Sequence, residues 1–91
     1  METSNSKIKK ILKISSTWCG PCRQLKKELE DFDLVPIIEV DADKDEQLCN
    51  DYGIKSIPTL IFLDEKEQEV FRHVGFIFKK DLRTLVDKLN E

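Results

Sequence analysis

The chain alternates short β-favouring apolar runs with stretches of helical periodicity. The first run, Ile8–Ile14, stops at Ser15 and is too brief for an ordinary helix, so it predicts a strand. Pro21 then stands where a helix can start, because proline is tolerated in the first turn. The apolar residues that follow it at helical spacing are Cys22, Leu25, Leu29 and Phe32. The opening of the chain therefore predicts a strand followed by a helix.

A second strand and a second helix are expected next. Val35–Val40 is β-rich. The acidic run after it includes Asp45, which can cap a short helix through Tyr52 that Gly53 ends. The acidic run lacks the glycine and the terminal glutamate of a calcium loop, so we interpret it as a helix-capping turn.

The last third predicts a hairpin and a closing helix. Thr59–Leu63 and Val70–Val74 are two further β-favouring runs, and the charged loop between them is short enough for an antiparallel connection. A final amphipathic helix is indicated by Leu82, Leu85, Val86 and Leu89. The order βαβ, then α, then ββα predicts an α/β domain of three layers, with a four-stranded mixed sheet flanked by three helices.

The 91 residues are enough for one domain. We expect residues 1–6, which are polar, to form a flexible N-terminal tail, and residues 7–91 to form the domain. The net charge of -3 argues against nucleic acid or an anionic membrane as partner, because both need clustered lysine and arginine. No apolar run reaches the length of about 18 residues that a membrane span needs, and the start of the chain has no secretory pattern, so we expect a cytoplasmic protein.

The candidate chemistry lies in Cys19-Gly-Pro-Cys22, between the first strand and the first helix. Cys19 is expected at the helix start, where free N–H groups and the positive end of the helix dipole favour a thiolate. The offset of three residues brings the second sulfur to disulfide distance. A thiolate of Cys19 that opens a substrate disulfide can thus be resolved by Cys22.

The string Trp18-Cys-Gly-Pro-Cys22, the later Tyr52–Thr59 segment with its Ile-Pro-Thr, and Val74-Gly75 resemble the thioredoxin family in order and spacing. The resemblance covers the chain from about Lys7 onward. It implies the thioredoxin fold in a minimal form. It also implies a cis peptide at Ile57-Pro58 packed against the cysteines. The substrate-binding residues that it implies are Trp18, Gly20, Pro21, Ile57, Pro58 and Gly75.

Two departures from the family accompany the resemblance. Few residues precede the first strand, so the family's usual N-terminal strand and helix are not expected, and Val35–Val40 becomes a sheet edge that Pro36 partly blunts. In addition, Lys13 stands where the family keeps a buried acid, and Ile37 replaces the family's partner lysine. We weigh two interpretations of Lys13: its ammonium reaches water along a buried stem, or it approaches Cys22 and modulates its pKa.

The resemblance implies a thiol–disulfide oxidoreductase that reduces protein disulfides and is re-reduced by a thioredoxin-reductase-like donor. It implies no cofactor beyond the Cys19–Cys22 disulfide, and a monomer. Three alternatives stay open: an oxidase or isomerase, a glutathione-linked enzyme, and an adaptor whose thiols are incidental. A zinc site is a further alternative, and its only four-ligand form needs Cys49 and His73 beside the pair. We instead expect Cys49 to be a buried core thiol and His73 an exposed surface residue, with no metal bound.

Overall fold

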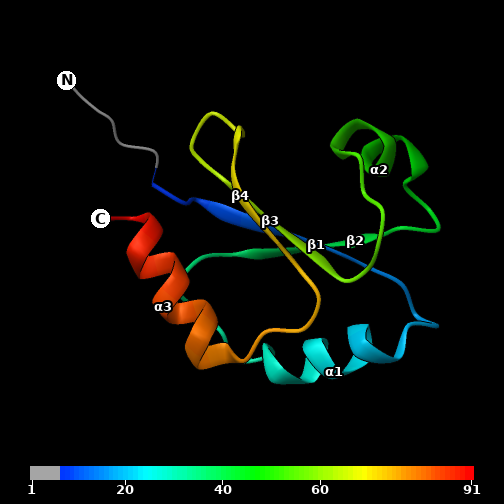
Figure 1. Ribbon diagram of the computed structural model, residues 1–91, viewed down its shortest axis with the longest axis horizontal. Helices are drawn as coiled ribbons and strands as arrows, with labels where there is room; N and C mark the ends of the chain where they lie inside the picture. The colour runs from blue at the N-terminus through cyan, green and yellow to red at the C-terminus, as the bar shows by residue number, and fades with distance from the viewer. Residues whose placement is uncertain (1–6) are drawn as a thin grey trace.

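The computed structural model describes residues 7–91, so the expected tail over residues 1–6 lies outside the described part. The described residues form four strands and three helices in the expected order (Figure 1). They are β1 (Lys10–Ser15), α1 (Gly20–Glu28), β2 (Ile37–Asp41), α2 (Glu46–Tyr52), β3 (Thr59–Leu63), β4 (Glu69–Val74) and α3 (Lys79–Leu89).

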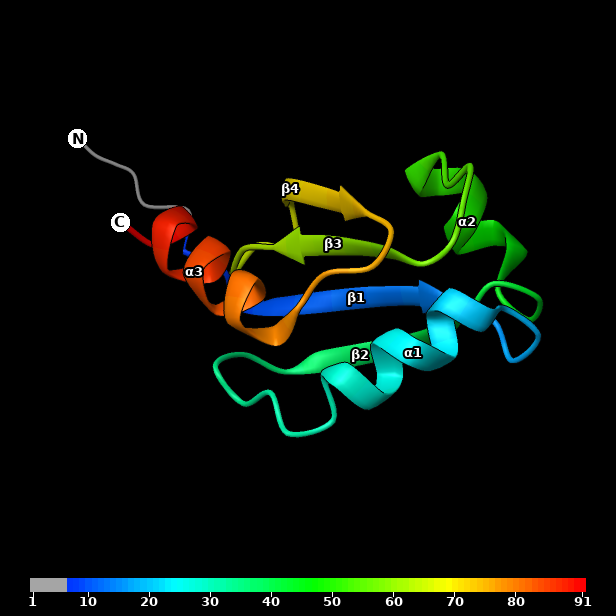
Figure 2. The same ribbon diagram turned by 60° about the horizontal axis from the view of Figure 1, so that its bottom comes forward.

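The strands build one mixed sheet in the order β2-β1-β3-β4 (Figure 2). β1 pairs with β2 in parallel, whereas β1 with β3 and β3 with β4 are antiparallel. The parallel pair needs a crossover, which α1 supplies, and the antiparallel pair β3–β4 is joined by the short loop that its sequence predicts. β2 lies at one edge of the sheet, which confirms the expectation for that strand.

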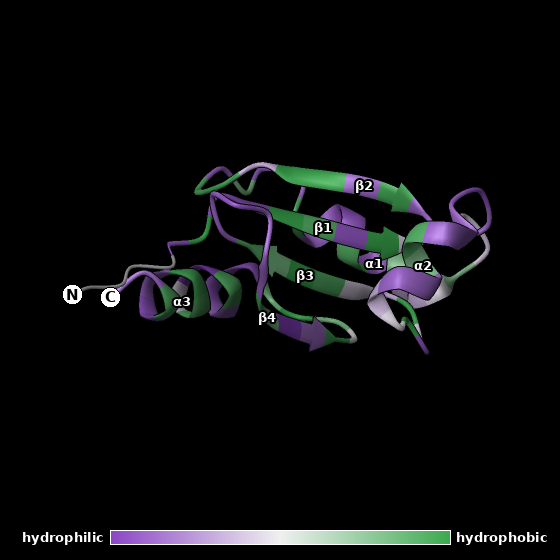
Figure 3. Ribbon diagram, turned by 90° about the horizontal axis from the view of Figure 1, so that it is seen from above, coloured by the Kyte–Doolittle hydropathy of each residue, from purple (hydrophilic) through white to green (hydrophobic). Residues whose placement is uncertain are grey.

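Two apolar clusters, one on each face of the sheet, make the three predicted layers. On one face, α1 and α3 pack on Ile11, Leu60 and Phe62 through Leu25 and Leu82, among others. On the other face, α2 covers a second cluster, whose buried members are Leu12, Ile14, Val40, Ile61 and Leu63. Figure 1 shows α1 and α3 together below the sheet and α2 above it. Figure 3 shows β1 and β3 in the middle of the sheet, both largely hydrophobic, with a hydrophilic band within β1.

The bounds of four elements differ from the sequence-based expectation, and for β4 the difference is only that it begins at Glu69 rather than Val70. β1 begins at Lys10 rather than Ile8, although Ile8 is still buried and its N–H donates to Asn90 Oδ1 over 2.7 Å. α1 ends at Glu28, and Phe32 packs against the core from the following turn. β2 begins at Ile37, so the Pro36 expected inside it precedes it.

Candidate active site

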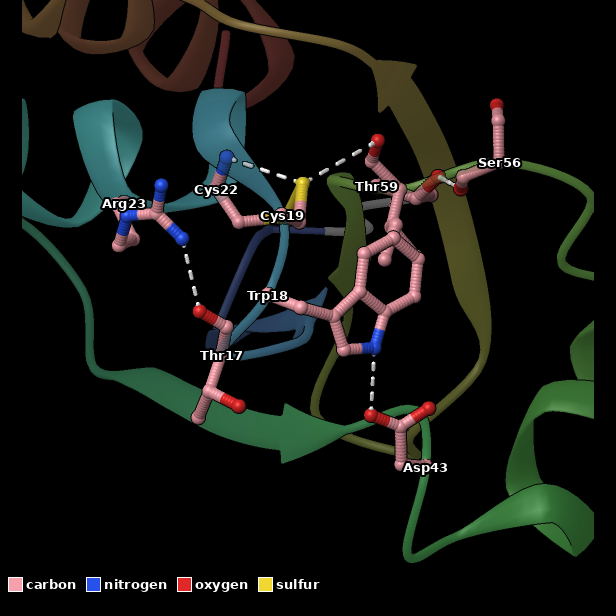
Figure 4. Close-up of a disulfide and its surroundings, with 9 residues drawn as sticks. Thr17, Trp18, Cys19, Cys22, Arg23, Asp43, Ser56 and Thr59 are labelled. Atoms are coloured by element: carbon pink, nitrogen blue, oxygen red, sulfur yellow. Dashed lines mark hydrogen bonds between the residues drawn. A yellow bond between two sulfur atoms is a disulfide. The ribbon is translucent and has the colours of Figure 1, made fainter.

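Cys19 and Cys22 form a disulfide at the junction of β1 and α1 (Figure 4). Their Cα atoms are 5.2 Å apart, within the usual span of a disulfide. Only 6% of Cys19 and 3% of Cys22 are exposed, so the pair is sunk into the surface rather than raised above it. The junction lies beyond the carboxyl end of β1, the position expected for a reactive site in a sheet of this kind.

Cys19 is the residue that caps the N-terminus of α1. Its Sγ accepts a hydrogen bond from the Cys22 N–H over 3.2 Å. Pro21 occupies the first turn, where a missing N–H costs nothing, and no acidic side chain lies in that turn. The same N–H and the helix dipole are available to a thiolate at Cys19 when the disulfide opens, so this end of α1 stabilises negative charge there.

The Ile57-Pro58 peptide is cis, as the resemblance implies, and lies against the disulfide. The Ile57 carbonyl oxygen is 3.9 Å from Cys19 Sγ. Gly75 lies beside this peptide, because its N–H donates to the Pro58 carbonyl over 2.8 Å. The pairing of Thr59 with Val74 explains the contact, since β3 starts directly after Pro58 and β4 ends directly before Gly75.

Trp18 directly precedes Cys19 and is 67% exposed. Its indole Nε1–H donates to Asp43 Oδ2 over 2.8 Å, a contact visible in Figure 4 that joins the loop before α1 to the loop after β2. Gly20 is half-buried and Pro21 exposed. The sequence analysis missed Asp43 as a partner of Trp18, because no local pattern connects two loops that meet only in the folded chain.

Exposed apolar side chains continue next to Gly75. Val74 is 56% exposed and Phe76 is 36% exposed. The sequence analysis did not name either as a site residue. The signal that could have pointed to them is their position in the sequence, directly before and after Gly75. Residues that adjoin a predicted site residue at the end of a strand are expected near the same site.

Lys13 is buried, and its ammonium forms a salt bridge with the Glu39 carboxylate. Only 3% of the residue is exposed, and its Nζ lies 2.6 Å from Glu39 Oε2. The ammonium therefore meets a carboxylate, which neither of the two interpretations of Lys13 includes. Lys13, Glu39 and Cys22 nevertheless line one cleft, between α1 and β2. The sequence analysis missed Glu39, although the parallel register of β1 and β2 pairs it directly with Lys13.

Cys49 and His73 lie on other parts of the domain than the disulfide. Cys49 is half-buried rather than buried, and packs against the cluster under α2. Burial, followed by the Asp45 and Glu46 carboxylates, raises the pKa of its thiol. His73 is half-buried rather than exposed, with Nε2 3.0 Å from the Phe76 carbonyl oxygen. Within residues 7–91, no three His, Cys, Asp or Glu side chains are grouped so as to hold a metal ion.

Comparisons with known proteins agree with this geometry. The family model described as Thioredoxin matches residues 2–88. The chain is 38% identical over 76 residues to a thioredoxin of Bacillus subtilis, covering 78% of this chain and 72% of the relative. It is 32% identical over 92 residues to thioredoxin 1 of Synechococcus elongatus, covering 96% and 85%. The structure of a mutant thioredoxin from Halobacterium salinarum has the same fold, with a TM-score of 0.82, 23% identity, and coverage of 96% of this chain and 79% of that one.

Proposed function

The chain belongs to the thioredoxin family and is a thiol–disulfide oxidoreductase, and from that premise we propose how its two cysteines divide the reduction of protein disulfides. Cys19 attacks the substrate and Cys22 resolves the intermediate. The observation that carries the proposal is the position of Cys19 at the N-cap of α1, with its Sγ hydrogen-bonded to the Cys22 N–H. That environment favours the thiolate, which is the nucleophile in disulfide exchange.

The reaction has two exchange steps that balance in electrons. The Cys19 thiolate attacks one substrate sulfur, the substrate S–S bond breaks, and the other substrate sulfur leaves as a thiolate that takes up a proton. Cys22 then loses its proton and attacks Cys19 Sγ. The mixed disulfide breaks, the second substrate sulfur leaves and is protonated, and the protein is left with the Cys19–Cys22 disulfide. Two electrons have moved to the substrate.

The substrate is proposed to bind in front of the disulfide as an extended segment. The support is the polypeptide around Ile57-Pro58, whose carbonyl oxygen lies 3.9 Å from Cys19 Sγ. Main-chain groups at such a position can pair with an extended peptide. We assign Trp18, Gly20 and Pro21, which adjoin the cysteines in the chain, and Gly75, whose N–H donates to the Pro58 carbonyl, to the same substrate surface. The exposed side chains of Val74 and Phe76 add apolar contact area.

The partners and the compartment follow from the same proposal. A thioredoxin-reductase-like donor returns two electrons to the Cys19–Cys22 disulfide, and no other cofactor takes part. The protein acts as a monomer in the cytoplasm, in electron transport and cell redox homeostasis. A reductase works in a compartment that keeps thiols reduced, and the free thiol of Cys49 suits that compartment. Within the described residues, no helix has the length and apolar character needed to cross a bilayer.

Single cysteine variants test the division of labour. With insulin as substrate, Cys19→Ser is expected to abolish disulfide reduction, because the attacking thiolate is lost. Cys22→Ser is expected to accumulate a mixed disulfide between Cys19 and the substrate, detected by mass spectrometry. Cys49→Ser is the matched control and is expected to reduce insulin at the wild-type rate. A mixed disulfide trapped through Cys22 in the Cys19→Ser variant would reverse the assigned roles.

A further inference from the structure

We propose that the charge pair of Lys13 and Glu39 controls the protonation of Cys22 from a cleft behind the disulfide, with the two charges acting in opposite directions. The inference rests on the proposed role of Cys22 as the resolving thiol, which must lose its proton before it can attack Cys19. Lys13 and Glu39 are positioning residues in this scheme, because they act through the charge that they present to Cys22.

The position of Lys13 in β1 aims it under α1. Side chains alternate between the faces of a strand, so Lys13 shares its face with Ile11, two residues earlier. Ile11 belongs to the cluster that includes Leu25 of α1. Lys13 is thus a lysine with 3% exposure, on the face of the sheet that α1 covers. A buried ammonium is costly unless paired, and Glu39, opposite it in the register, supplies the pair over 2.6 Å.

The cleft joins this pair to Cys22. It has a volume of about 670 Å³, is open to solvent, and is lined by Cys22, Lys13 and Glu39. Ser16 also lines it, and its hydroxyl is buried without a hydrogen-bond partner in the described part of the chain. Buried hydroxyls in polar sites with room normally bind water. The cleft therefore places a polar, solvent-connected space beside Cys22.

Other charged groups facing the cleft are less effective than the pair. From α1 these are Arg23, Lys26 and Lys27, from the turn after α1 Glu30, and from β2 Asp41. The side chains of Arg23, Lys26, Lys27 and Glu30 are exposed, so water and salt screen them. Glu39 is also 55% exposed, but it differs from them because its Oε2 lies 2.6 Å from the buried Lys13 ammonium. Lys13 is the buried charge of the set. It favours the Cys22 thiolate, while the Glu39 carboxylate opposes it, so the two charges together hold Cys22 between the extremes that either would impose alone.

The two charges predict opposite changes in the ionisation of Cys22 when each is removed. In Lys13→Met the carboxylate acts alone, so Cys22 should ionise less readily, the reduced form should lose stability, and the protein should become a stronger reductant. In Glu39→Gln the ammonium acts alone, and every sign reverses. We expect the acid dissociation constant of Cys22 to fall in the first and rise in the second, each on the order of three- to tenfold.

The experiment is a titration of the reduced full-length protein, followed by carbon-13 NMR of labelled cysteine Cβ atoms, which separates Cys22 from Cys19 and Cys49. The equilibrium with glutathione is measured on the same samples. The matched control is Lys10 with Glu67, a pair 2.8 Å apart that also starts from β1 but does not line the cleft. Lys10→Met and Glu67→Gln should leave the Cys22 titration unchanged.

Opposite shifts in Lys13→Met and Glu39→Gln, absent from the controls, support the inference. Shifts of the same sign, or no shift, overturn it. Should Lys13→Met fail to fold, Glu39→Gln decides alone, because the Glu39 side chain is 55% exposed and its change disturbs little packing. Insulin reduction by the wild type is measured in parallel: a wild type that cannot reduce insulin refutes the proposed function, whereas an active wild type with unshifted variants refutes only the charge-pair control.

Discussion

Arg72 in β4 is hydrogen-bonded to the end of α2, just before the segment that carries Ile57. We expect its replacement to lower the free energy of unfolding. Its guanidinium binds the Glu69 carboxylate through two contacts, of 2.6 Å from Nε and 2.8 Å from Nη2. Nη2 also donates to the Tyr52 carbonyl over 2.7 Å, directly before the turn at Gly53. One side chain therefore connects the outer strand to the start of the segment that leads to the disulfide.

The geometry sets the expected magnitudes. The Arg72 and Glu69 side chains are 29% and 32% exposed, and two-point contacts of this kind are stronger than ordinary surface pairs. We expect Glu69→Gln to cost about 1 kcal/mol in the free energy of unfolding. Arg72→Met also removes the bond to the Tyr52 carbonyl, so we expect a cost of about 2 kcal/mol. For a domain of this size, these losses correspond to about 5 °C and about 10 °C in Tm.

The pH dependence has a definite sign. Hydrogen bonding to Arg72 is the main cause that holds the pKa of Glu69 below its usual value, and the same bond raises the pKa of Arg72. A carboxyl with a lowered pKa in the folded state stabilises above the pKa of the unfolded chain, and that stabilisation is lost as the pH falls through the folded value. The difference between wild type and Glu69→Gln should be complete at about pH 7 and shrink below about pH 4.

Urea unfolding followed by circular dichroism at a series of pH values measures this difference. Equal slopes of free energy against urea in both proteins are needed for the comparison, because a changed slope means a changed folded or unfolded state. Asp64→Asn, in the β3–β4 loop, gives a carboxylate change on the same hairpin away from Arg72. If the deficit of Glu69→Gln is as large at about pH 3 as at about pH 7, the ionised pair is not its source.

Two further predictions concern reactivity and the third helix. In the oxidised protein, iodoacetamide should alkylate Cys49 more slowly than it alkylates glutathione at neutral pH, because burial raises the pKa of the Cys49 thiol. Mass spectrometry measures both rates, and equal rates would contradict the prediction. Glu28→Ala should lower the free energy of unfolding by about 1 kcal/mol in urea titrations. The reason is that Glu28 Oε2 accepts the Lys79 N–H over 2.8 Å at the start of α3, where the N-cap residue makes no side-chain hydrogen bond. An unchanged urea midpoint would show that this hydrogen bond does not stabilise the fold.

Elements with local start and stop signals could be predicted from the sequence almost to the residue. α2 is the clearest case, because Asp45 caps it by accepting the Leu48 N–H and Gly53 ends it with a φ of 63°. Both signals act within a few residues of the helix ends. The predicted end of the first helix was wrong, because Phe32 continues the apolar spacing of α1 although it contacts the core from the turn after the helix.

The candidate site divides in the same way between local and distant information. The disulfide and the cap by Cys19 follow from four adjacent residues and the strand–helix junction, so the sequence predicts them directly. The contacts with Ile57 and Gly75 depend on the pairing of β3 with β4, and only the family resemblance supplied them in advance. To predict the contact of Glu39 with Lys13, one needs the register between β1 and β2. The periodicity of each strand alone does not reveal that register.

The first turn of α1 separates two environments, and each sulfur of the disulfide belongs to one of them. Cys19 lies beside the Ile57 carbonyl, whereas Cys22 lines the cleft with Lys13 and Glu39. A substrate has to meet the first sulfur, but the proton that leaves during resolution comes from the second. Under the charge-pair proposal, a change in the cleft alters the rate of resolution and leaves the contact of Cys19 with the Ile57 carbonyl unchanged. That proposal therefore makes substrate selection and redox potential separable properties of this site.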